Sequence, residues 1–150
     1  MQMIINQLQK IIKDYAPQLK KLSDEDFSYK PIPNQWSNKE VLGHLIDSAH
    51  NNIRRFIVAQ YVDKPYIVYE QDYWVVAAGY QYYHIKDLID LWILTNKHIV
   101  MIFKNIPETA LNREVKTHEI RTIEWLAADY NKHQLHHLHQ ILKLAPVAYP

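Results

Sequence analysis

Apolar side chains recur every three or four residues along four long segments of the chain. This spacing places them on one face of an α-helix, so each segment is predicted to form an amphipathic helix. The predicted helices cover residues 3–22, 38–57, 85–106 and 123–144. Pro17 falls within the first helix and is expected to kink or loosen it. No segment shows a convincing strand pattern, and the fold class is therefore predicted to be all-α.

The start of the second helix carries the strongest local signal. Ser37 is a suitable N-cap, and Glu40 stands three residues later, which is the spacing of a capping box. Trp36 before the cap and Val41 after it form a candidate hydrophobic staple. These residues predict where the second helix begins.

The connections between the helices predict how the helices pack. A loop over residues 23–35 favours an antiparallel first pair, whereas residues 61–83 form a crossover long enough for a parallel second and third helix. A short helix is expected within the crossover at 71–78, and residues 107–121 are predicted to be a loop. Such a long crossover is often functional. Four helices without a linker predict one four-helix bundle domain over residues 1–150.

Four of the nine histidines lie within residues 133–139. His133 and His137 are four residues apart and extend the apolar stripe of the fourth helix, so both should face the core on adjacent turns. His136 and His139 are turned away from that line and are interpreted as bystanders. Two inward imidazoles on adjacent turns can bind one metal ion. The simpler interpretation of such a pair is a polar helix end.

His44 provides a third imidazole at the same height in the bundle. It lies seven residues after the Ser37 cap (44 − 37), and His137 lies seven residues before Leu144 (144 − 137), the expected end of the last helix. If the second and fourth helices are antiparallel, both positions are about 10 Å from the same end of the bundle. The sequence therefore predicts that His44, His133 and His137 converge, although His44 alone would be interpreted as a hydrogen-bonded core residue.

Composition narrows the possible chemistry. The 150 residues contain no cysteine, so any metal ligands must be His, Asp or Glu. The net charge of +1 gives no charge excess for binding nucleic acid or anionic lipid. No apolar run is long enough to span a membrane, and no signal peptide is apparent. A cytoplasmic location is expected.

Three neutral imidazoles suit zinc, and also nickel, cobalt or iron. Three protein ligands leave a position open for water or substrate, as in catalytic sites. Asp47, one turn after His44, is a candidate to orient a ligand or the substrate, or else a solvated helix residue. Arg54 and Arg55 could bind an anionic thiol cofactor but are interpreted as solvated.

Two segments together resemble the DinB/YfiT-like superfamily: residues 36–47, Trp-Ser-Asn-Lys-Glu-Val-Leu-Gly-His-Leu-Ile-Asp, and the segment 130–141 around His133 and His137. The resemblance spans nearly the whole chain. It implies a four-helix bundle whose three metal-binding histidines map onto His44, His133 and His137. Members are commonly dimers. Some relatives transfer low-molecular-weight thiols such as bacillithiol or mycothiol, and others are described as metal-dependent hydrolases.

The function expected from this resemblance is a metal-dependent thiol S-transferase, using a bacillithiol-like thiol and most simply zinc or nickel. A metal-dependent hydrolase and a noncatalytic metal-binding bundle remain the alternatives. A small-molecule substrate, with a low-molecular-weight thiol as one candidate, and a homodimer are expected. Neither nucleic acid nor a membrane is expected as a partner.

Overall fold

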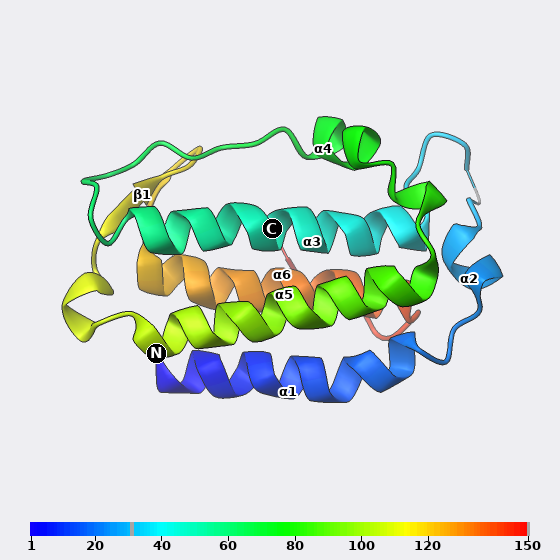
Figure 1. Ribbon diagram of the computed structural model, residues 1–150, viewed down its shortest axis with the longest axis horizontal. Coiled ribbons are helices and arrows are strands. Elements are labelled where there is room, and N and C mark those ends of the chain that lie inside the picture. The colour runs from blue at the N-terminus through cyan, green and yellow to red at the C-terminus, as the bar shows by residue number, and fades with distance from the viewer. Residues whose placement is uncertain (31, 150) are drawn as a thin grey trace.

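Four long helices lie side by side in the computed structural model, which describes residues 1–30 and 32–149 (Figure 1). They are α1 (Gln2–Leu19), α3 (Asn38–Val58), α5 (Ile85–Asn105) and α6 (Ile123–Ile141). The shorter elements are α2 (Asp24–Ser28), α4 (Gln71–Ala78), η1 (Tyr80–Tyr82), η2 (Glu108–Ala110), β1 (Glu114–Lys116) and β2 (Ile120–Thr122). The predicted four-helix bundle is confirmed.

Helices α3 and α6 are in contact and run in opposite directions. Figure 1 shows α1 and α6 running one way, and α3 and α5 running the other way. The long helices pack in a ring, in which α3 and α1 each contact both α5 and α6. The parallel pair α3–α5 and the antiparallel return of α6 agree with the prediction. Helices α1 and α3 run antiparallel as predicted, but they lie diagonally across the ring rather than packing as a pair.

Local capping fixes where the two site-bearing helices begin. The Ser37 side chain accepts from the backbone N–H of Glu40 at 3.2 Å, and the Ser37 N–H donates to the Glu40 carboxylate at 2.7 Å. This confirms the predicted capping box of α3. Thr122 caps α6 by accepting from the N–H of Trp125 at 3.2 Å. The caps fix where each helix starts, and burial of the apolar stripe then turns the histidines inward.

Two predicted helices end earlier than expected. The first ends at Leu19, two residues after Pro17, rather than at residue 22. The last ends at Ile141 rather than at residue 144, and Lys143 then adopts a left-handed backbone conformation with φ of 54°. The prediction extended too far because Leu22 and Leu144 continue the apolar spacing beyond the residues at which the helices end.

Short elements occupy two segments that were predicted to be loops. Helix α2 lies within residues 23–35, where Ser23 and Asp26 form a second capping box. A hairpin occupies the end of the segment 107–121 and extends to Thr122 of β2, which pairs with Glu114 of β1. Both predictions were wrong because these elements are shorter than the window needed to establish a hydrophobic period.

The hairpin also holds the long crossover in place. The N–H of Ile67 donates to the carbonyl of Lys116 at 3.0 Å, and the N–H of Lys116 donates to the carbonyl of Pro65 at 3.0 Å. These bonds fix the crossover along α3, as Figure 1 shows. The predicted helix at 71–78 is present as α4.

Polar side chains divide the core into two apolar clusters. One cluster contains residues from the start of α1 and the end of α3 and lies toward the hairpin. The other contains residues from the opposite halves of these helices and lies toward α2. Between them, Trp92 donates to Gln134 at 2.8 Å, and Tyr130 donates to Asn96 at 2.7 Å. The polar side of α6 that carries His133 lies at this level, so the site is built where the core is already polar.

Candidate metal centre

Three histidines from two facing helices bring their ring nitrogens together. One nitrogen from each of His44, His133 and His137 lies within 4.8 Å of the other two. The Nε2 atoms of His44 and His133 are 3.0 Å apart. Ring centroids are separated by 4.7 to 5.1 Å, and each pair of rings is close to perpendicular. The structure therefore brings together the three residues that the sequence singled out.

The donor set fits a divalent metal ion. Nitrogen ligands at about 2.0–2.1 Å in tetrahedral geometry are about 3.4 Å from one another. The His44–His133 pair is already within that spacing, and all three nitrogens lie within 4.8 Å of one another. His44 Nδ1 is buried without a hydrogen-bond partner in the described part of the chain. The His44 ring is therefore held by its contact with His133 and by packing, and not by a protein partner at Nδ1.

Hydrogen bonds orient the two histidines of α6. The Nδ1–H of His137 donates to the Gln140 side-chain oxygen at 3.0 Å, so the Nε2 lone pair remains free. On the neighbouring turn, His133 Nδ1 lies 3.3 Å from the Ser48 hydroxyl. Metal-binding histidines commonly use their second nitrogen in this way, which fixes the tautomer and the ring. The Trp36 ring packs against His44 with centroids 5.0 Å apart.

Burial keeps these imidazoles neutral, as metal ligands must be. Burial, together with the neighbouring His137, lowers the pKa of His44 to about 3. The pKa of His133 is held well below its ordinary value, first by burial and then by the other histidines. Burial also lowers the pKa of His137. At neutral pH all three rings therefore offer lone pairs and carry no charge that would repel a cation.

Asp47 is buried, with 2% of its surface exposed, so a solvated helix residue is excluded. One carboxylate oxygen accepts from the Tyr80 hydroxyl at 2.5 Å, and the other has no partner in the described residues. Burial raises the pKa of Asp47 to about 6, although the Tyr80 bond lowers it. Its hydrogen bond thus goes to η1 and not to one of the three histidines.

The other histidines of α6 hold the C-terminal segment. His136 Nδ1–H donates to the carbonyl of Val147 at 2.8 Å, and His139 Nδ1–H donates to the carbonyl of Ala145 at 2.7 Å. His139 Nε2 also accepts from the Tyr15 hydroxyl at 2.6 Å. Neither His136 nor His139 belongs to the three-histidine cluster.

Cavities lie on two sides of the histidine cluster. One of about 200 Å³ is lined by His44 and His133, and one of about 460 Å³ is lined by His137. Gln71 at the start of α4 lines both, so the crossover covers the site. The smaller cavity also contains Tyr149, whose ring centroid lies 5.2 Å from that of His133.

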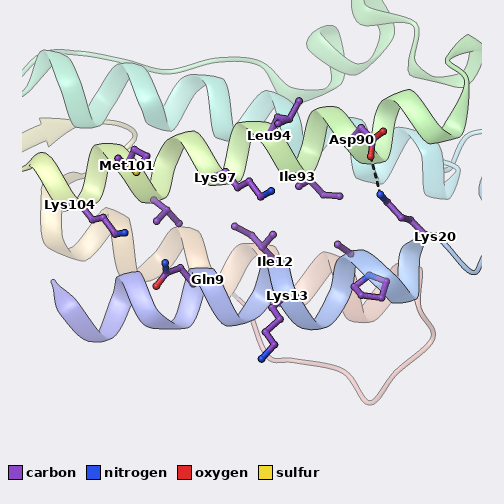
Figure 2. Close-up of a pocket in the computed structure, with 13 residues that line it drawn as sticks. Gln9, Ile12, Lys13, Lys20, Asp90, Ile93, Leu94, Lys97, Met101 and Lys104 are labelled. Carbon is purple, nitrogen blue, oxygen red and sulfur yellow. Dashed lines mark ion pairs between the residues drawn. The ribbon is translucent and has the colours of Figure 1, made fainter.

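A larger cavity of about 930 Å³ lies apart from this chemistry, between α1 and α5 (Figure 2). Lys97 and Lys104 of α5 extend toward α1 across it, and Lys20 forms an ion pair with Asp90 at 3.1 Å. Its lining is aliphatic side chains, lysines and few other polar groups, without a histidine. The smaller histidine cavities are the better candidate site because converging polar groups, rather than volume, mark a site of chemistry.

Several residues around the cluster escaped the sequence analysis. Ser48 and Gln140 follow their histidine neighbours by a turn, at His44 + 4 and His137 + 3, so helical spacing could have found them. Tyr149 had no such signal, because it reaches the site only through the folded C-terminal segment. The interpretation of Arg55 as solvated was wrong: it is half-buried beside the site, whereas Arg54 is exposed.

Sequence and structure comparisons agree on the family and the fold. A sequence model described as the DinB superfamily matches residues 7–141. YfiT from Bacillus subtilis, described as a probable metal-dependent hydrolase with an unusual four-helix bundle topology, superposes with a TM-score of 0.83 at 19% identity. That superposition covers 95% of this chain and 83% of YfiT. No curated protein sequence matches the chain.

A second solved structure shares the bundle but extends beyond it. The mycothiol-dependent maleylpyruvate isomerase superposes with a TM-score of 0.72 at 14% identity. The match covers 98% of this chain but 61% of the isomerase. At these identities both likenesses describe the fold. Across the described residues, no helix is both long enough and apolar enough to cross a membrane.

Proposed function

The chain belongs to the DinB superfamily, and from this premise we propose that it is a metal-dependent enzyme acting on a small molecule, most specifically a thiol S-transferase. The observation that carries the proposal is the convergence of the His44, His133 and His137 ring nitrogens within 4.8 Å. These three residues would hold the ion. A divalent metal supplies Lewis acidity there, which lowers the pKa of a thiol or a water that binds to it.

The family resemblance supports thiol transfer, and the groups around the histidines are sufficient for that reaction. The side chains that hydrogen-bond to the cluster are Ser48 and Gln140, neither of which titrates near neutral pH. Among the described residues no carboxylate bonds to the three rings to serve as a general base. Transfer of a thiol needs none: sulfur bonds to the electrophilic carbon, the leaving group departs with its electron pair, and the thiol proton goes to water.

The chain's own residues have roles in this proposal. Gln140 and Ser48 orient His137 and His133, and Trp36 packs against His44. Asp47 is proposed to act outside the three ligands by holding Tyr80, and with it the crossover that covers the site. Metal-dependent hydrolysis is the second candidate, because YfiT, the structure with the higher TM-score, is described in those terms.

A direct experiment separates these possibilities. Purified protein is analysed for its metals, with zinc or nickel expected. It is then assayed with low-molecular-weight thiols and alkylating electrophiles, with thioether formation followed by mass spectrometry. His137→Ala should lose both metal and activity, whereas the neighbouring His136→Ala should retain both. Ester or amide cleavage without thioether would favour the hydrolase, and bound metal without either activity would favour a noncatalytic bundle.

The homodimer and the cytoplasmic location remain proposals. The family resemblance supports the first, and the cysteine-free composition supports the second. Light scattering of the purified protein and fractionation of cells that express it test them. Neither outcome alters the assignment of the histidines, because all three ligands come from one chain.

A further inference from the structure

A positively charged side chain also lines the cavity beside His44 and His133. Arg55 lines it from α3, and the cavity volume is about 200 Å³. Arg55 lies eleven residues after His44 (55 − 44), which is about 16 Å along the helix axis. Helical side chains lean toward the helix N-terminus, so the long Arg55 side chain shortens that separation. A small elongated ligand can therefore lie between the histidines and the guanidinium.

A continuous polar row connects the two. His44, Ser48, Asn52 and Arg55 follow one another at intervals of four, four and three residues, which places them on one face of α3. The Asn52 amide donates to the Ser48 hydroxyl at 3.3 Å, and the Ser48 hydroxyl lies 3.3 Å from His133 Nδ1. Arg55 donates to Asn52 at 3.4 Å. This wall of the cavity suits a polar ligand.

The Arg55 guanidinium is held in place before any ligand binds. Its Nε and Nη2 atoms donate to the carbonyl of Ile67 at 3.2 and 3.1 Å. That carbonyl belongs to the crossover segment that the hairpin fixes through Lys116. The guanidinium also lies 5.9 Å from the centroid of the Tyr69 ring. A positioned cation loses little conformational entropy when it binds an anion.

The charge of Arg55 is only partly compensated. Within residues 1–30 and 32–149, no carboxylate forms an ion pair with it, although it is half-buried. A guanidinium has five N–H groups, of which three are used here. One N–H remains on each terminal nitrogen, and both are available to the oxygens of a carboxylate.

We propose that this cavity is a subsite for the carboxylate of an elongated substrate, with Arg55 as its receptor. The proposal rests on the metal-dependent function above and adds the substrate class: a small molecule whose reacting group lies at the histidines and whose anionic end lies at Arg55. Asp129 on α6 also lines the cavity and accepts from the Tyr149 hydroxyl at 2.9 Å. Its negative charge opposes the binding of an anion, so the two residues should act with opposite sign.

The test uses metal-loaded protein and two matched series of probes. ω-Mercaptocarboxylic acids of increasing chain length are compared with ω-mercaptoalkanols of the same lengths by isothermal titration calorimetry at fixed ionic strength. The variants are Arg55→Met and Asp129→Asn. Arg54→Met serves as the matched control, because it removes the same charge from the adjacent exposed position. Circular dichroism confirms that each variant is folded.

The expected result is a preference of the wild type for the acids at the chain length that reaches Arg55. Arg55→Met should weaken acid binding by roughly tenfold to a hundredfold and leave alcohol binding unchanged, as for loss of a charge-assisted hydrogen bond. Asp129→Asn, which can still accept from Tyr149, should strengthen acid binding. Equal effects of Arg55→Met and Arg54→Met, or equal acid and alcohol affinities at every length, would overturn the subsite.

The subsite and the metal-dependent function fail in different ways. Loss of the metal-dependent function appears as an absence of bound metal in elemental analysis. The same acids are titrated into metal-free protein, where the ratio of their affinities for Arg55→Met and Arg54→Met still measures the contribution of Arg55. A ratio near one in both forms rejects the subsite, whatever the metal analysis gives.

Discussion

At the scale of single residues, the four histidines of residues 133–139 differ in the partner of a second ring nitrogen. His133 and His137 direct that nitrogen to Ser48 and Gln140, and their inner nitrogens face His44. The bystanders His136 and His139 donate to carbonyls of the C-terminal segment instead. One helix thus uses adjacent histidines for two tasks, and the 100° turn between successive residues assigns them.

Gln140 should matter for metal binding although it never touches the ion. Replacing it by alanine removes the acceptor that fixes the His137 ring. Loss of such a supporting bond typically lowers metal affinity by about 10–100-fold, and that is the expected result for Gln140→Ala. Competition with a calibrated chelator measures it. Lys132→Ala, an exposed change on the same helix, is the control, and equal affinities of the two variants would argue against an orienting role.

The three neutral imidazoles should make the metal-free protein sensitive to acid. The unfolded chain takes up protons below the ordinary pKa of 6.5, whereas the folded chain resists because burial lowers all three pKa values. Stability is therefore lost as the pH falls from 6.5 toward 3. His44 alone accounts for about 2 kcal/mol between pH 7 and pH 5. Urea midpoints of chelated protein at the two pH values test this.

Asp47 affects the pH dependence of stability with the opposite sign to the three histidines. Its pKa is raised from 3.8 to about 6, so the folded state binds an extra proton and gains stability as the pH falls through that range. The three imidazoles together change the stability more than the one carboxyl group does, so a net loss of stability is expected as the pH falls. His44→Asn should lose less stability between pH 7 and pH 5 than the wild type does. His98→Asn, a change at an exposed position, should lose as much stability as the wild type. An identical loss in His44→Asn and the wild type would contradict the assignment.

Helical spacing was enough to predict the cluster and not enough to predict its surroundings. The period of α6 separated His133 and His137 from His136 and His139, and distances from the helix ends placed His44 opposite them. Arg55 was misinterpreted because its environment depends on Ile67 and Tyr69 of the crossover, whose path is set by distant hydrogen bonds. A one-dimensional period carries no information about such contacts.

At the scale of elements, the crossover packs closely against α3 because α3 has a glycine, without a side chain, at the contact. The Tyr80 ring of η1 lies where a Cβ on Gly43 would be, at 2.1 to 2.6 Å from its ring atoms. That close approach brings the Tyr80 hydroxyl to Asp47, one turn further along α3. The absence of a side chain at Gly43 therefore lets the crossover pack over the site, and the glycine is not there for backbone flexibility.

Gly43→Ala should destabilise the protein despite better helix propensity. Alanine favours a helix interior over glycine by about 1 kcal/mol, but overpacking typically costs about 1–3 kcal/mol. The expected net loss is about 1–2 kcal/mol in urea unfolding. In a Tyr80→Leu background the clash is relieved, so the same change should become neutral or stabilising. A loss of equal size in both backgrounds would show that Tyr80 is not the cause.

Long elements were predictable and short ones were not. Each bundle helix repeats its apolar stripe over several turns, and the Ser37–Glu40 box marks one start unambiguously. Helix α2 buries only Phe27, and strand β1 buries only Val115, so neither repeats a period. Yet the hairpin determines where the crossover lies, and the least predictable element therefore shapes one wall of the site.

At the scale of the whole molecule, the histidine cluster is an addition to a core that is complete without it. Two apolar clusters on either side of the polar layer draw on all four long helices. Each buries large side chains fully, such as Phe56 and Phe103 in one and Trp92 in the other. A zinc finger, in contrast, has little core apart from its metal. Folding of the bundle should therefore not depend on the ion.

Chelation should accordingly lower the melting temperature without unfolding the protein. An ion that binds only the folded chain adds about 2.7 kcal/mol when its free concentration is a hundredfold above Kd. For a domain of this size each kcal/mol shifts the melting temperature by about 2–4 °C, so a decrease of about 5–10 °C is expected. His44→Ala is the matched control, since it should show almost no further shift on chelation. Scanning calorimetry of both proteins decides the matter: a chelated wild type already unfolded at room temperature would make the metal structural, which removes the main support for an open catalytic site. An unchanged melting temperature, with metal demonstrably bound before chelation and absent after it, would mean that the fold does not build a site from these three histidines.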